Sequence, residues 1–209
     1  MILPALNPVF LTASALITLA PGPDNLYVVS KGISQGRKSA LVAAAGFASG
    51  LSVHTTLAAC GLSALLLASA VAFTCVKLLG AAYLVYLGIR TLGARGLVAV
   101  PDSGQALPPR RIFAQAFLMN VLNPKVAMFF LAFLPQFARP ERGPLAPQLC
   151  QLGGVFALIA LALFSMLGLC SSLLGRWIRS RPRLTRGLDR AVGVLFILLG
   201  LGLALSRRR

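Results

Sequence analysis

Two short stretches of the sequence place prolines and a charged residue inside segments that are otherwise apolar. The first reads Pro-Gly-Pro-Asp-Asn over residues 21–25, and the second reads Asn-Pro-Lys over residues 123–125. Proline has no N–H, so it leaves the carbonyl four residues earlier without its helical donor. Within a bilayer such carbonyls persist only where protein or a water-filled cavity satisfies them. Broken, charged helices of this kind are typical of transporter substrate sites.

The chemistry of these two stretches suits a zwitterion. The released carbonyls can accept hydrogen bonds from an ammonium group, and the N–H groups that start the next helical segment suit a carboxylate. Asp24 would bind the ammonium group or carry a proton, and Lys125 would bind the carboxylate or pair with Asp24. We therefore predict a substrate site that contains Pro21, Gly22, Pro23, Asp24, Asn25, Asn120, Asn123, Pro124 and Lys125.

Most of these residues also have a purely structural interpretation. Asp24 suits the N-cap of a helix that restarts at Asn25. Lys125 suits a lysine that extends its ammonium group from near a helix end. Asn120 and Asn123 share one helix face, where they either bind polar substrate atoms or cap the broken turn. The prolines could simply bend the helices.

A polar patch in the next apolar segment surrounds the single histidine of the chain. His54 either relays protons, with Asp24 as the other coupling residue, or forms hydrogen bonds between helices. Gly46 and Gly50 lie four residues apart in the same segment and predict a face for close helix packing. Four cysteines show no CxxC spacing and are expected to be buried as small apolar side chains. They are Cys60, Cys75, Cys150 and Cys170.

The composition indicates one integral membrane domain over residues 1–209. Of these residues 57% are hydrophobic and 11% are charged, against about 25% charged in soluble domains. No Lys, Arg, Asp or Glu occurs over residues 39–76 or 143–175, and each run exceeds the roughly 20 residues of a transmembrane helix. We predict an all-α protein with spans at residues 4–30, 40–66, 70–92, 112–136, 147–175 and 188–206.

The formal charge of +16 lies mostly in the gaps between these spans. Positive residues concentrate in the first, third and fifth gaps, which the positive-inside rule places in the cytoplasm with both termini outside. This distribution assigns the charge to membrane topology and not to a nucleic acid partner. The arginines at 207–209 do not fit this orientation, and a five-span or re-entrant arrangement is the alternative.

The spans divide into two halves of three, with repeat one at residues 1–95, a linker at 96–111 and repeat two at 112–209. Because each half has an odd number of spans, the halves enter the membrane in opposite directions. Each half opens with one of the two proline motifs. This predicts two inverted repeats in which helices 1 and 4 are broken and the breaks meet near the midplane.

In these same residues the chain resembles the lysine exporter superfamily, and most of all its homoserine/threonine resistance branch. The matching motifs cover most of residues 16–137 and lie at 21–25, Gly36, Gly46, Gly50, 77–84, 86–88, 117–125 and 129–137. The resemblance implies a multi-pass exporter of the bacterial inner membrane. It would carry amino acids or close derivatives as a secondary antiporter driven by proton entry. The implied partners are the amino acid, protons and the bilayer, and a homo-oligomer is left open.

Two other functions stay open at this stage. Metal-cation efflux occurs in the same superfamily, but soft metals need grouped thiolates or imidazoles and hard metals need several carboxylates. A membrane thiol–disulfide oxidoreductase needs cysteines placed for exchange. The sequence groups none of these side chains, so we expect a transporter that has no catalytic residue, metal or cofactor and is not an enzyme.

Overall fold

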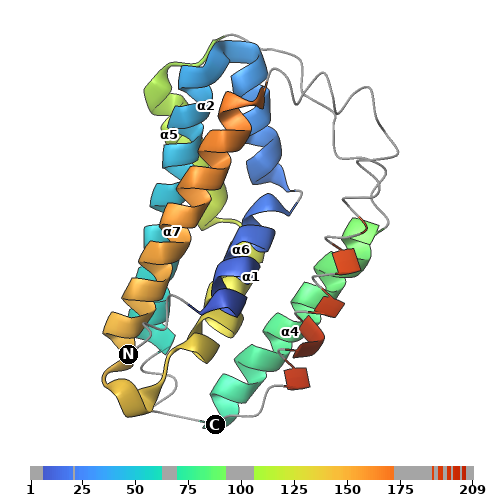
Figure 1. The fold of residues 1–209 in the computed structure, drawn as a ribbon, viewed down its shortest axis with the longest axis vertical. Helices are drawn as coiled ribbons and strands as arrows, with labels where there is room; N and C mark the ends of the chain where they lie inside the picture. The colour runs from blue at the N-terminus through green and yellow to red at the C-terminus, as the bar shows by residue number, and fades with distance from the viewer. Residues whose placement is uncertain are drawn as a thin grey trace.

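The computed structural model describes residues 7–20, 22–62, 70–92 and 106–171, and near the C-terminus residues 190, 193–194, 197–198, 200–202 and 204–205. Pro21 and the arginines at 207–209, which the sequence analysis singles out, lie outside the described residues, as does the side chain of Pro124. All the described regular elements are helical (Figure 1).

The described elements are given in chain order. The longer helices are α1 (Pro8–Leu19), α2 (Pro23–Leu57), α4 (Ala70–Leu92), α5 (Pro109–Val121) and α7 (Leu145–Leu169). A π-helical turn, η2 (Ala58–Leu62), extends α2. The five residues of α6 (Pro124–Met128) continue into the π-helical turn η3 (Phe129–Phe133), followed by the 3-10 turns η4 (Leu134–Phe137) and η5 (Pro140–Arg142).

Helix α2 consists of two helical segments that meet at Gly36. This glycine has φ 82° and ψ 177°, a conformation that is almost restricted to glycine because any Cβ would clash with the backbone. The rings of Tyr27 and Phe47, one from each segment, lie 5.9 Å apart. The chain therefore turns back at Gly36, and residues 23–35 and 37–57 form a helical hairpin (Figure 1).

The core of the bundle forms where α2 packs against α5 and α7, and α1 also contacts α7. Small residues allow the helices to approach closely. A Cβ added to Gly46 would lie 2.6 Å from the carbonyl oxygen of Phe113, and one added to Gly50 would lie 2.8 Å from the Cβ of Asn120. The predicted packing face of α2 is thus confirmed, and α5 is the helix that it contacts.

Helix α4 stands at one side of the bundle in Figure 1, with described residues of the C-terminal region along it. The two are in close contact, because a Cβ added to Gly88 would lie 2.6 Å from the carbonyl oxygen of Gly193. A Cβ added to Gly200 would likewise lie 2.7 Å from the carbonyl oxygen of Ala81. Contacts between α4 and η3 join this side to the rest of the molecule.

The described helices fit an integral membrane protein. Two stretches, Pro23–Gly61 and Leu145–Leu169, contain a helix long and apolar enough to cross a bilayer, and in the first this helix is the part that follows the turn at Gly36. The pair Pro109–Val121 and Lys125–Phe137, bent by 49°, supplies a third span if it counts as one. Six spans in two inverted repeats stay a prediction, because residues 63–69, 93–105 and 172–189 lie outside the described part of the chain.

The prediction that the cysteines are buried is wrong. All four are exposed on the surface of the protein: Cys60, Cys75, Cys150 and Cys170. In a membrane protein a small apolar side chain loses little by facing outward, because lipid tails are as apolar as the protein interior.

Candidate functional site

The first proline motif lies between two helices. Helix α1 ends at Leu19, and α2 begins at Pro23 with the extended residue Gly22 as its N-cap. The amide nitrogen of Asn25 donates to the carbonyl oxygens of Leu19, at 2.9 Å, and Ala20, at 3.0 Å. Since Pro23 cannot donate to Leu19, the Asn25 side chain replaces the missing backbone donor.

The interpretation of Asp24 as an N-cap is wrong. The helix restarts at Pro23 and not at Asn25, so Asp24 lies in the first turn of α2. A carboxylate there interacts favourably with the positive end of the helix dipole. Its side chain is also free of the capping role and contacts the second motif.

The second proline motif also separates two helices. Helix α5 ends at Val121, and α6 begins at Pro124 with Asn123 as its N-cap. The side-chain oxygen of Asn123 accepts a hydrogen bond from the backbone N–H of Lys125 at 3.0 Å. Pro124 has no N–H to donate to the carbonyl of Asn120, and this carbonyl accepts a hydrogen bond from the backbone N–H of Asn123 at 2.9 Å. The expected capping role of Asn123 is therefore confirmed.

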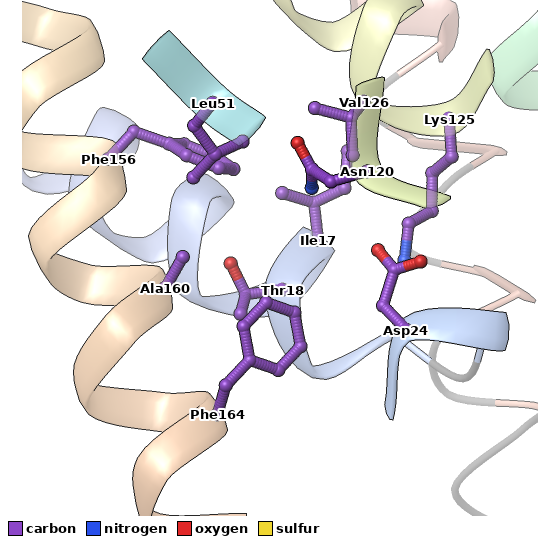
Figure 2. Close-up of a pocket in the computed structure, with 10 residues that line it drawn as sticks. All are labelled: Ile17, Thr18, Asp24, Leu51, Asn120, Lys125, Val126, Phe156, Ala160 and Phe164. Atoms are coloured by element: carbon purple, nitrogen blue, oxygen red, sulfur yellow. The ribbon is translucent and has the colours of Figure 1, made fainter. Parts of the chain in front are cut away.

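Reciprocal hydrogen bonds join the two motifs. The amide nitrogen of Asn123 lies 2.8 and 2.9 Å from the two carboxylate oxygens of Asp24. In the other direction, the ammonium group of Lys125 donates to the carbonyl oxygen of Ala20 at 3.3 Å. Asp24 and Lys125 are 1% and 7% exposed, and Figure 2 shows the lysine extending toward the carboxylate. A buried acid and a buried base thus meet where the two motifs come together.

A small cavity opens beside these charges. Three of its polar lining residues, Asp24, Asn120 and Lys125, come from the predicted set, and Thr18 is a fourth. The remaining lining residues are apolar: Ile17, Leu51, Val126, Phe156, Ala160 and Phe164. Figure 2 shows the α7 side chains on the side opposite Asp24 and Lys125. The free space is about that needed by a single water molecule.

His54 lies next to the second motif. One of its ring nitrogens, Nε2, is 3.0 Å from the carbonyl oxygen of Asn120, and the ring lies 5.6 Å from that of Phe130. Because a carbonyl only accepts hydrogen bonds, Nε2 must carry the proton. The predicted hydrogen bonding between helices is confirmed for His54.

Two buried side-chain oxygens at the site have no hydrogen-bond partner within the described part of the protein. They are the Oδ1 atoms of Asn25 and Asn120. Buried polar atoms are nearly always satisfied, and of these two residues Asn120 lines the cavity. Within residues the structure describes, no three side chains from His, Cys, Asp and Glu group as metal ligands.

Sequence reasoning found the charged half of the site and missed the apolar half. The structure brings together Gly22, Asp24, Asn25, Asn123 and Lys125, which the two motifs predict. Thr18 was missed although a hydroxyl in an apolar helix is a readable signal. The apolar wall had no such signal, because its residue types are those of any helix core.

Nearly the whole chain is similar to known membrane proteins. A family model described as LysE type translocator matches residues 15–207. A homoserine/homoserine lactone efflux protein of Salmonella typhimurium is 32% identical over 198 residues, 95% of each chain. An uncharacterized membrane protein of Vibrio cholerae is 35% identical over 199 residues, 95% of this chain and 96% of that one. An uncharacterized membrane protein of Bacillus subtilis is 28% identical over 206 residues, 94% and 97% of the two chains. No solved structure matches the chain.

Proposed function

The chain belongs to the family of LysE type translocators, and from this premise we propose that it exports amino acids or close derivatives by alternating access coupled to proton entry. It is a multi-pass protein of the bacterial inner membrane. The name of the Salmonella relative, a homoserine/homoserine lactone efflux protein, supports a substrate of this chemical class.

The observation that carries the proposal is the pair of opposite charges buried between the two motifs. Asp24 is held by the amide of Asn123, and Lys125 is held by a backbone carbonyl. An amino acid offers the same groups, since its ammonium can replace the donors at Asp24 and its carboxylate can replace the acceptor at Lys125. The substrate therefore exchanges existing hydrogen bonds for equivalent ones, which limits the cost of burying its charges.

The small size of the cavity supports a transport cycle in which the site opens and closes. Its free space suits about one water molecule, so an amino acid enters only when the two motifs separate. Separation toward the cytosol admits the substrate between α1–α2 and α5–α6. Separation toward the outside then exposes it there. This is the alternation that a site between inverted repeats permits.

Protonation of Asp24 completes the proposed cycle. A proton that arrives from outside neutralises the carboxylate and removes its attraction for the substrate ammonium. The substrate leaves, and the proton is carried inward when the site faces the cytosol again. Inward proton movement down its gradient thereby drives outward movement of the amino acid.

The test is efflux from cells preloaded with labelled amino acids, including homoserine. Asp24→Asn keeps the shape of the side chain but removes its charge, and Lys125→Ala removes the base. Each is expected to reduce efflux to about a tenth or less, because a charge-assisted hydrogen bond to the substrate is lost. The matched controls are Glu141→Gln and Lys38→Ala, which alter exposed residues and should leave efflux unchanged.

Undiminished efflux in Asp24→Asn and Lys125→Ala would remove both residues from the mechanism. A deletion strain that became sensitive to metal salts while its amino-acid efflux was unchanged would favour metal-cation transport. Loss of activity on thiol alkylation would favour an oxidoreductase that uses the exposed cysteines.

A further inference from the structure

We infer that His54 is a positioning residue that supplies the hydrogen bond which Pro124 withholds from the carbonyl of Asn120. In an unbroken helix, residue 124 would donate its N–H to that carbonyl, but proline has none. The imidazole Nε2 of His54 lies 3.0 Å from the oxygen and comes from a different helix, α2.

The sequence of α2 explains how the ring reaches this carbonyl. Gly46, Gly50 and His54 follow one another at intervals of four and so lie along one helix face. A Cβ on Gly50 would lie 2.8 Å from the Cβ of Asn120 and 3.0 Å from the carbonyl oxygen of Phe117. The glycines bring the α2 backbone close to α5, and His54, the next residue on this face, contacts the end of α5.

The position of the second motif depends on this contact. Asn120 is 1% exposed, so bulk water cannot donate a hydrogen bond to its carbonyl oxygen in place of His54. The same carbonyl accepts the backbone N–H of Asn123, whose side chain holds Asp24. His54 therefore fixes the turn from which the amide of Asn123 reaches the carboxylate.

This role differs from that of a proton carrier. A positioning residue needs only a donor at the place of Nε2, and a glutamine amide supplies one without titrating. A proton carrier needs a group that gains and loses a proton, and glutamine would abolish its function. Of the measurements that test this inference, only the efflux assay depends on the proposed function.

The first experiment compares His54→Leu with His54→Gln in the labelled efflux assay at several external pH values. We expect the leucine variant to lose about tenfold in efflux, since the buried carbonyl of Asn120 then keeps only the backbone N–H of Asn123 as a donor and the second motif is held less firmly. The glutamine variant should recover most of the efflux, with the pH dependence of the wild type. Thr56→Val, an exposed change two residues along α2, is the control for altered helix packing.

The second experiment does not depend on transport. His54 is the single histidine of the chain, so 15N-histidine labelling gives NMR signals from this ring alone in the purified, detergent-solubilised protein. We expect a proton bound to Nε2. We also expect the thermal unfolding temperature to be highest for the wild type, lower for His54→Gln and lowest for His54→Leu.

Either of two results would overturn the inference. One is an Nε2 without a proton, which would remove the hydrogen bond. The other is a glutamine variant that folds to wild-type abundance and loses efflux as completely as the leucine variant, which would make His54 a proton carrier. Absence of efflux from the wild type itself would count against the proposed function, and the NMR and unfolding results would still decide the role of His54.

Discussion

At the scale of single residues, the site depends on the small size of a glycine as well as on its charges. A Cβ added to Gly22 would lie 3.1 Å from the ammonium nitrogen of Lys125, which is closer than most side chains tolerate. The backbone of Gly22 is extended, with φ −171°, so any residue adopts its conformation. The glycine is therefore needed for the space that it leaves and not for its flexibility.

Gly22→Ala is expected to reduce efflux several-fold while the protein still reaches the membrane in normal amounts. The new methyl group displaces the ammonium group of Lys125 by a few tenths of an ångström and weakens its bond to Ala20. Efflux and membrane abundance measured on the same cells check this. Normal efflux from Gly22→Ala would show that the position of the ammonium group is not critical.

The residues that sequence reasoning identified at this scale share one property, which is that they are out of place in an apolar segment. Asp24 and Lys125 are costly there unless they serve a purpose, so their types alone mark them. Phe156 and Phe164 lie equally close to the cavity, yet a phenylalanine in a membrane helix is unremarkable by type. The sequence does not show which helix faces which, and only the folded chain selects these two.

At the scale of elements, the turn within α2 depends on one backbone conformation. Gly36 has φ 82°, and a Cβ added there would meet nothing within 4 Å. A substitution at Gly36 would therefore act by straining the backbone conformation and not by a clash with neighbouring residues. The basic residues of the predicted first gap led us to expect a loop, but the helices on both sides continue up to this single residue.

Gly36→Ala should lower the free energy of unfolding by about 1–3 kcal/mol, the cost of a strained backbone conformation. Gly154→Ala is the matched control, because Gly154 lies inside α7 with nothing within 4 Å of an added Cβ. Alanine favours a helix interior over glycine by up to about 1 kcal/mol, so the control should be neutral or stabilising. Denaturant titration of both purified variants measures the difference, and equal stabilities would mean that the turn tolerates a side chain.

At the scale of the whole molecule, the hairpin turn and the segment around η5 lie at opposite ends of the bundle (Figure 1). Hydropathy and charge predicted a helical membrane protein without any knowledge of packing, because a run of about 20 apolar residues has few alternatives. The orientation of the bundle depends on where the positive charges lie. This orientation is testable directly.

With the four native cysteines replaced, single cysteines at Lys38 and Glu141, both exposed, report the two ends. An impermeant thiol reagent should label Glu141→Cys in intact cells and Lys38→Cys only after the membrane is permeabilised. The reverse pattern would invert the predicted topology. Labelling of both from outside would contradict a bundle that spans the bilayer.

The reciprocal bonds between the two proline motifs have a consequence for the resting cell. Under the proposed mechanism, a protein with neither substrate nor proton bound keeps its shape, because movement would separate Asp24 and Lys125 from their hydrogen-bond partners. In the proposed cycle only the substrate, or a proton on Asp24, replaces these bonds, so a protein that has released its proton inside cannot turn outward again without substrate and does not leak protons. A bacterium can then keep this exporter in its membrane permanently without draining its energy supply.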